Sequence, residues 1–209
     1  MTLDHGLQPT TDRLPYFDSL YSRDEDPYGM RTRWYEERKR NVLLAALPHR
    51  RYGTAYEPGC GAGELTVSLA ARCDTVLASD FNALAVASAR KRTATLANVR
   101  IESHQLPKDW PSGEAPFDLI VVSELGYFLD APAMGALAAR CEASLTPEGV
   151  LVACNWRPDF KERALSTDDV HAAFTGTGLT RLVRHEEDDF LLELWCRDGR
   201  SVAQREGIR

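Results

Sequence analysis

The chain has 209 residues, of which 44% are hydrophobic and 27% are charged, a balance typical of one globular domain with a short extension. Its 31 acidic residues outnumber its 25 basic ones and give a net charge of −6. This charge disfavours long-range attraction to nucleic acid or to an anionic membrane surface, so we expect neither as a partner.

The N-terminal quarter is predicted to differ from the rest. We expect residues 1–25 to form a flexible N-terminus and residues 26–48 to form a capping segment, followed by one globular domain over 49–209. A helix is predicted from about 32 to 47, because apolar residues recur there at helical spacing.

From residue 54 onward, short apolar runs alternate with longer helix-like stretches, which is typical of βαβ units around a parallel sheet. The last two runs are separated by a short acidic turn, so we expect them to pair as a hairpin. The predicted fold is α/β, with a Rossmann-like, seven-stranded, mostly parallel sheet, a C-terminal antiparallel hairpin and helices on both faces. The predicted strands are 54–57, 75–79, 99–102, 117–123, 150–154, 180–187 and 190–197, and the predicted helices between them are 64–72, 83–96 and 131–145.

The stretch YEPGCGAGE places Gly59, Gly61 and Gly63 at alternate positions directly after the first strand of that sheet. A dinucleotide-binding turn requires G-x-G-x-x-G, and its third glycine position is occupied here by Glu64. The mismatch counts against NAD, although an NAD-dependent oxidoreductase stays an alternative. The turn suits an adenosine with an amino-acid tail, because glycine lets the backbone approach a ligand closely.

Two acidic residues flank this turn. Glu57 ends the first strand, where it can accept hydrogen bonds from an ammonium group. Asp80 ends the second strand, where a carboxylate can accept both ribose hydroxyls, and Phe81 follows it. Because ligands of open α/β sheets lie at the carboxyl ends of strands, we expect these groups to meet in one crevice.

The pattern E-x-G-x-G-x-G with an aspartate ending the next strand resembles the class I S-adenosylmethionine-dependent methyltransferases, as does FDLIVVSELGYFL at 117–129. The resemblance implies S-adenosylmethionine as cofactor, S-adenosylhomocysteine as product, and Ser123 as a cofactor contact. Many members carry an acidic residue for the adenine amino group after the third strand. This chain has ESHQLP instead, which makes His104 and Gln105 the candidates, unless His104 is a surface residue.

A narrower resemblance covers DPYGMRTRWYEERKRNVLLAALP at 26–48. It is similar to the NodS-like group, named for nodulation-factor N-methyltransferases that methylate an amine on a chitooligosaccharide. The resemblance implies that Tyr28, Arg33 and Trp34 close the site over the methionine end of the cofactor. For Trp34, burial in the core is an equal alternative.

Methyl transfer is an in-line displacement, so catalysis can rest mostly on orienting the acceptor, with at most one base. Glu124 follows the fourth strand and is the first candidate for a base or an ammonium anchor, although it can equally cap the next turn. Tyr127 is a candidate to line the acceptor site or to donate a hydrogen bond to the acceptor. We expect Asn155 and Trp156 to face the same crevice and His171 to lie on a helix surface.

The five cysteines are widely spaced without a C-x-x-C pair, and no His/Asp/Glu cluster is evident, so no metal is predicted. We expect a cytoplasmic protein, since neither a leader nor a run of ~20 apolar residues is recognisable. The predicted function is methylation of a small-molecule or saccharide acceptor at an amine. An O-methyltransferase and a non-catalytic S-adenosylmethionine-binding module stay as alternatives, and the oligomeric state stays open.

Overall fold

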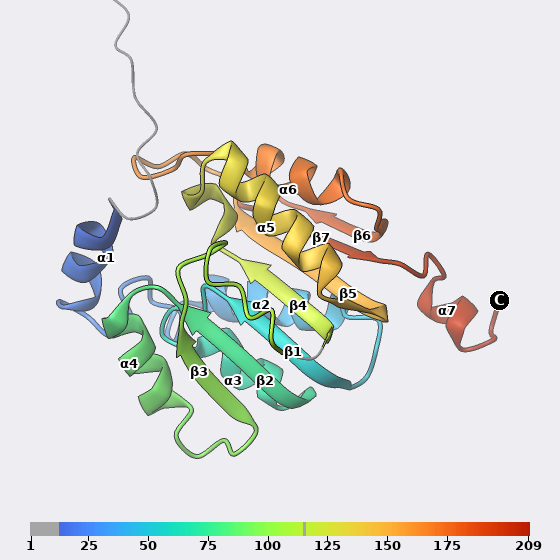
Figure 1. Ribbon diagram of the computed structural model, residues 1–209, viewed down its shortest axis with the longest axis horizontal. Coiled ribbons are helices and arrows are strands. Elements are labelled where there is room, and N and C mark those ends of the chain that lie inside the picture. The colour runs from blue at the N-terminus through green and yellow to red at the C-terminus, as the bar shows by residue number, and fades with distance from the viewer. Residues whose placement is uncertain (1–12, 115) are drawn as a thin grey trace, which may run out of the picture.

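A computed structural model describes residues 13–114 and 116–209 of the chain. Its centre is a seven-stranded sheet in the order β3-β2-β1-β4-β5-β7-β6 (Figure 1). The first five strands pair in parallel, whereas β7 runs antiparallel to both of its neighbours. The predicted α/β fold with its closing hairpin is therefore confirmed. The strands are β1 (Tyr52–Pro58), β2 (Cys73–Asp80), β3 (Val99–Ser103), β4 (Phe117–Ser123), β5 (Leu145–Trp156), β6 (Thr180–Glu186) and β7 (Phe190–Cys196).

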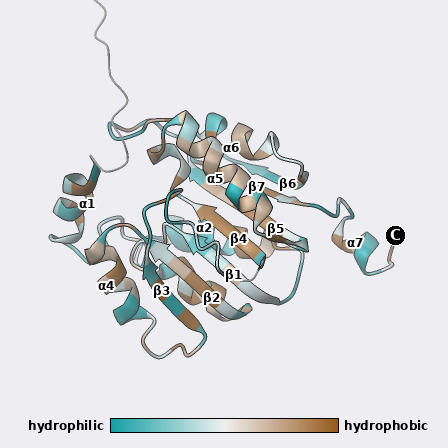
Figure 2. Ribbon diagram, viewed as in Figure 1, coloured by the Kyte–Doolittle hydropathy of each residue, from teal (hydrophilic) through white to brown (hydrophobic). Residues whose placement is uncertain are grey.

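Helices cover both faces of the sheet. Alternate residues of β4 show the division, because Leu119 packs with helices α2 and α3 whereas its neighbour Ile120 packs with α5 and α6. Figure 2 shows β4 as an apolar strand in the middle of the sheet, as burial on both faces requires. The α-helices are α1 (Leu14–Tyr21), α2 (Trp34–Ala46), α3 (Glu64–Ala70), α4 (Ala83–Arg92), α5 (Ala131–Ala143), α6 (Thr167–Thr175) and α7 (Val202–Arg205).

Side chains at the helix starts define where the crossover helices begin. The Asn82 side chain accepts hydrogen bonds from the first amides of α4, and Asp130 does the same for α5. Ser166 and Asp169 form a capping box at the start of α6. None of the helices within the described ranges is long and apolar enough to cross a lipid bilayer.

Two short helices were not predicted. The segment 1–25 was expected to be flexible. Residues 1–12 lie outside the described residues, and within 13–25 the chain forms helix α1. Helix α7 follows the last strand. Strand β5 is also longer than expected, so Asn155 and Trp156 belong to the strand rather than to a loop after it.

His171 is not on a helix surface, as we had expected, but 2% exposed on the side of α6 that packs on the sheet. It follows Val170 on the buried stripe of that helix. Its Nδ1 lies 2.9 Å from Glu193 Oε2 and its Nε2 lies 3.2 Å from Asn155 Oδ1. Asn155 therefore faces helix α6, whereas the next residue, Trp156, lines the crevice as expected. Successive residues of a strand point to opposite faces of the sheet.

The strand order reverses between β1 and β4, and the carboxyl ends of β1 to β5 lie along one edge of the sheet. The glycine turn and Glu124 follow strands at this edge, and Asp80 is the last residue of β2. A crevice at such a reversal is the usual ligand site of an open α/β sheet.

The last glycine of the turn, Gly63, is predicted to be required for stability. Its φ is +83°, and an added Cβ would lie 3.2 Å from Ala89 Cα of helix α4. We expect Gly63→Ala to lower the free energy of unfolding by about 1 to 3 kcal/mol. Gly135→Ala, in the middle of α5 with open space around the new methyl, is the matched control and should stabilise by up to about 1 kcal/mol. Urea unfolding measures both, and equal effects would contradict the packing role.

Candidate functional site

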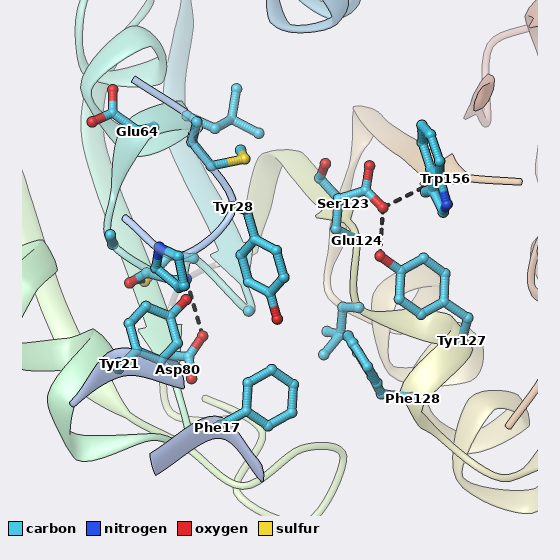
Figure 3. Close-up of a pocket in the computed structure, with 18 of the residues that line it drawn as sticks. Phe17, Tyr21, Tyr28, Glu64, Asp80, Ser123, Glu124, Tyr127, Phe128 and Trp156 are labelled. Carbon is cyan, nitrogen blue, oxygen red and sulfur yellow. Dashed lines mark hydrogen bonds between the residues drawn. The ribbon is translucent and has the colours of Figure 1, made fainter. Parts of the chain in front are cut away.

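A cavity of about 560 Å³ opens at the carboxyl ends of the parallel strands. Figure 3 shows Asp80 and Tyr21 on one side of it, Glu124, Tyr127 and Trp156 on the other, and Tyr28 between them. The predicted site residues that line this cavity are Tyr28, Arg33, Glu57, Gly59, Gly61, Asp80, Phe81, His104, Gln105, Ser123, Glu124 and Tyr127. Gly63 and Trp34 are not part of the lining.

The structure does not bring Trp34 to the site or into the core, because its side chain is 68% exposed. Helix α2 begins at this residue and turns the next ones, Tyr35 and Glu36, toward the cavity. One step along a helix rotates a side chain by about 100°, so Trp34 points away from the face that lines the site.

The glycine turn is held against the end of β2. Gly59 and Cys60 both donate backbone hydrogen bonds to the Ser79 carbonyl oxygen, at 2.7 and 2.9 Å. Gly59 and Gly61 have φ values of +73° and +52°, in the left-handed region that favours glycine. An added Cβ at Gly61 would lie 2.9 Å from the Tyr21 hydroxyl. The turn therefore presents bare backbone to the cavity.

The carboxylate of Asp80 links this turn to helix α4. Its Oδ2 accepts a hydrogen bond from Gly61 N at 3.0 Å, and its Oδ1 accepts one from Asn82 N at 2.9 Å. Burial raises the pKa of this carboxyl, and backbone hydrogen bonds from Asn82, Gly61 and Phe81 act against the rise. A carboxylate has about four acceptor positions, so capacity remains for hydroxyl groups of a ligand in the cavity.

Glu57 is a buried carboxyl, 3% exposed, that lines the same wall. The Thr66 hydroxyl donates a hydrogen bond to its Oε2 at 2.6 Å. Burial raises the pKa of Glu57 to about 8, although the Thr66 contact lowers it. A cation placed beside this carboxyl would restore its charge, so the residue suits the ammonium group of an amino-acid tail.

His104 has protein partners at both ring nitrogens. Its Nδ1 lies 3.3 Å from the Tyr56 hydroxyl and its Nε2 lies 3.0 Å from Glu102 Oε2. The side-chain amide of Gln105, in contrast, makes no hydrogen bond to any residue in the described ranges. Of the two candidates for the adenine amino group, Gln105 is the one with unused hydrogen-bonding capacity.

Glu124 stands at the opposite wall in a left-handed backbone conformation, with a φ of 55°. Its Oε2 accepts hydrogen bonds from the Tyr127 hydroxyl at 2.6 Å and from Trp156 N at 2.9 Å (Figure 3). Its Oε1 accepts one from Lys39 Nζ at 2.6 Å. Both oxygens are thus engaged by protein donors, so Glu124 joins helix α2, the turn after β4 and the end of β5.

Lys39 was missed from the sequence. It is 5% exposed on α2, where a lysine four residues after Tyr35 and four before Leu43 continues the inward-facing stripe. Burial alone would lower the pKa of its ammonium, but the carboxylates of Glu124 and Glu36 outweigh burial and raise it. Lys39 is therefore positively charged inside the site.

Helix α1 contributes a further wall that the sequence did not reveal. The Phe17 ring packs edge-on against Phe81 at 5.3 Å and against Phe128 at 5.1 Å, so it joins the two sides of the cavity. Asn82 Nδ2 donates a hydrogen bond to Asp18 Oδ1 at 2.7 Å. Together these contacts hold α1 across the site.

Residues 55–149 match the family described as the methyltransferase domain. A solved structure from Pseudomonas syringae, provisionally named a methyltransferase, is 45% identical over 78% of this chain and 99% of that chain, with a TM-score of 0.70. The chain belongs to the class I S-adenosylmethionine-dependent methyltransferases. As a member of that family, it uses S-adenosylmethionine as methyl donor.

The methyltransferase also resembles nodulation proteins. Nodulation protein S of Bradyrhizobium diazoefficiens is 27% identical over 193 residues, which cover 86% of this chain and 90% of that protein. The solved N-methyltransferase NodS of Bradyrhizobium japonicum, in complex with S-adenosylhomocysteine, has the same fold, with a TM-score of 0.78 and 23% identity over 90% of this chain and 98% of that one. The predicted resemblance to the NodS group is confirmed.

Glu57 makes the stability of the methyltransferase depend on pH. Its carboxyl keeps a proton up to about pH 8 when folded, but releases it near 4.5 when unfolded, so the folded state binds more protons between these values. Stability due to this group therefore falls as pH rises from about 5 to 8. We compare the free energy of unfolding of Glu57→Gln with that of wild type, both without cofactor. On going from pH 5 to pH 8.5, we expect this difference to shift by about 2 to 4 kcal/mol in favour of the variant.

Urea unfolding at the two pH values measures this gain. Glu37→Gln, on an exposed position of α2, is the control and should follow the wild-type profile. Parallel profiles for Glu57→Gln and wild type would show that Glu57 is ionised in the folded protein at neutral pH.

Proposed function

We propose that this methyltransferase acts on an amine nitrogen of a small-molecule or saccharide acceptor. The observation that supports an amine is the charge of the cavity, because acidic side chains outnumber basic ones in its lining. Such a cavity attracts cationic or proton-donating groups. Besides Glu57, which keeps its proton at neutral pH, the acidic lining residues are Asp26, Glu36, Glu64, Asp80, Glu124, Glu162 and Asp189, and the basic ones are Arg13, Arg33 and Lys39.

The wall around Asp80 fits the cofactor. The exposed backbone at Gly59 and Gly61 accommodates a ligand at close approach, Asp80 retains acceptor positions for ribose hydroxyls, and Glu57 suits the ammonium group. S-adenosylmethionine supplies there a methyl group already activated on a sulfonium. We propose that residues 26–48 cap this wall, with Tyr28 and Arg33 in the lining.

The wall around Trp156 suits the acceptor. Tyr35 packs edge-on against Trp156 at 5.6 Å, and Tyr127 packs edge-on against Phe160 at 5.1 Å. Aromatic faces of this kind bind the apolar faces of small rings and sugars while polar groups set the orientation. These residues hold the acceptor and exclude water, so that its nitrogen lone pair can be aimed at the methyl group.

An amine is favoured over a hydroxyl by the state of Glu124. An alcohol or phenol acceptor must lose a proton on attack and needs an available base. Glu124, the carboxylate expected to serve, already accepts hydrogen bonds from Lys39, Tyr127 and Trp156. A neutral amine has its lone pair ready. The N-methyltransferase name of the similar NodS structure supports the same choice.

We also propose a cytoplasmic location and an acceptor other than nucleic acid. The five cysteines are buried free thiols, as is usual in a reducing compartment. The net charge of −6 opposes binding to a polyanion.

The amine proposal predicts which acceptors turn over. With S-adenosylmethionine and a panel of paired amines and alcohols that include amino sugars, we expect release of S-adenosylhomocysteine with amines and product mass increased by one methyl group. Turnover of alcohols alone would make the protein an O-methyltransferase. Cofactor binding without turnover of any acceptor would favour a non-catalytic binding module.

Asp80→Ala tests the cofactor wall. Loss of two charge-assisted hydrogen bonds to the ribose, partly replaced by water, should weaken S-adenosylmethionine binding by about 2 to 4 kcal/mol. Asp74→Ala removes a carboxylate from the same strand, where it pairs with Arg51 outside the cavity, and should leave the affinity unchanged. Calorimetric titration measures both. An affinity of Asp80→Ala within about threefold of wild type, or ~0.7 kcal/mol, would place the ribose elsewhere.

A further inference from the structure

Helix α2 presents two polar groups to the cavity whose hydrogen-bonding capacity is unused by the residues that the structure describes. Tyr35 and Glu36 both line the cavity. The Tyr35 hydroxyl oxygen and Glu36 Oε2 are buried atoms without a hydrogen-bond partner, and Glu36 is 8% exposed. Buried polar groups are nearly always hydrogen-bonded, so this pair indicates that a polar ligand completes the site.

The charges around Glu36 indicate what kind of ligand this is. Lys39 Nζ lies 3.0 Å from Glu36 Oε2 and 2.6 Å from Glu124 Oε1, so one ammonium is shared by two carboxylates. The contact with Glu36 is an ion pair without hydrogen-bond geometry. With all three side chains ionised, the cluster carries one excess negative charge. An excess buried charge is costly, and hydrogen bonds from the N–H groups of a neutral amine would stabilise it without adding a charge.

Of the two carboxylates, Glu36 is the one that can take a ligand. Glu124 already accepts three hydrogen bonds, from Lys39, Tyr127 and Trp156, and so has less free capacity than Glu36. Glu36 has only the ion pair with Lys39 among the described residues. Glu124 thus holds the lysine in place, and the lysine in turn holds Glu36 at the cavity.

The location agrees with a role toward the acceptor rather than the cofactor. Tyr35, the neighbour of Glu36, packs against Trp156 at the end of β5, and Trp156 N binds Glu124. Figure 3 shows Glu124 and Trp156 on the side of the cavity opposite Asp80. Glu36 therefore belongs to the wall where the acceptor is expected.

We propose that Glu36 is the carboxylate that binds the amino group of the acceptor, with the Tyr35 hydroxyl as a second polar contact, and that it selects amines over hydroxyls. This assignment rests on the proposed amine methylation. Glu36 accepts a hydrogen bond from an N–H of the neutral acceptor, which leaves the nitrogen lone pair free to point at the methyl group. The N–C bond forms as the S–C bond of the sulfonium breaks, and the methylammonium product, paired with Glu36, releases its proton to solvent. Glu36 is thus a specificity-determining residue of this chain.

The test compares acceptors that differ only in an amino group or a hydroxyl. One pair is the β-1,4-linked tetramer of glucosamine and that of glucose, and the other is tyramine and tyrosol. Binding is measured by calorimetry on the full chain saturated with S-adenosylhomocysteine. We expect wild type to prefer the amine at least tenfold in at least one pair. Glu36→Gln should lose at least tenfold affinity for that amine, while its affinity for S-adenosylhomocysteine stays within twofold.

Two further variants control for indirect effects. Glu37→Gln changes the adjacent carboxylate on the exposed side of α2 and should behave as wild type. Tyr35→Phe removes only the second polar contact and should lose about threefold in amine affinity, which keeps the assignment testable should Glu36→Gln not fold. A merely structural role would lower cofactor and acceptor binding together and would leave the preference for amines intact.

The other outcomes overturn the assignment. The assignment is wrong if wild type shows no preference for the amine in either pair. It is also wrong if Glu36→Gln keeps the wild-type affinity for the amine, or loses affinity for S-adenosylhomocysteine to the same extent. Steady-state kinetics separates this failure from failure of the proposed function. Amines methylated by Glu36→Gln with the wild-type KM would refute the assignment alone, whereas methylation of only the hydroxyl members by wild type would refute both.

Discussion

The contact between Lys39 and Glu124 joins the two parts of the chain that form the site. Lys39 lies on helix α2 and Glu124 follows β4, 85 positions later, yet their charged atoms are 2.6 Å apart. A buried ion pair adds little net stability, because desolvation offsets the attraction, but removing one partner is strongly destabilising. The pair therefore acts mainly by fixing where α2 sits over the strand ends, and with it the shape of the cavity.

Glu124 also connects the Lys39 contact to the other residues of the acceptor wall. Glu124 binds Tyr127 in the following turn and Trp156 at the end of β5, and its left-handed backbone is maintained by these partners. Elements from three distant parts of the chain thus share one carboxylate. The cofactor wall depends on it less, because Asp80 is held by the backbone amides of Gly61 and Asn82.

The cofactor wall could be predicted from the sequence because its features are local. Gly59 and Gly61 lie in the turn that follows β1 and Asp80 is the last residue of β2, and the geometry of parallel sheets brings strand ends together. The seven strands were predictable for the same reason, since each is a short apolar run bounded by turn residues. Only their ends differ from the prediction, as in the case of β5.

The acceptor wall could be predicted only in part: Glu124, Tyr127 and Trp156 were expected at the strand ends, whereas the contribution of helix α2 depends on contacts between residues far apart. A lysine in the charged run of α2 is usually solvent-exposed, and the ion pairs with Glu124 and Glu36 explain the burial of Lys39. Helix α1 was missed although Leu14, Phe17 and Tyr21 recur at helical spacing, because a segment of eight residues near the N-terminus was assigned to a flexible extension. His171 is buried through partners on β5 and β7, neither of which is its neighbour in sequence.

The excess of carboxylates around the cavity also influences the end of the catalytic cycle. These side chains attract the positive sulfonium of the methyl donor, whereas the thioether left after transfer carries no such charge. For each carboxylate within about 4 Å, the lost attraction amounts to about 1 to 4 kcal/mol, depending on how much water screens it. This electrostatic contribution therefore favours the sulfonium form of the cofactor over the thioether that remains after transfer.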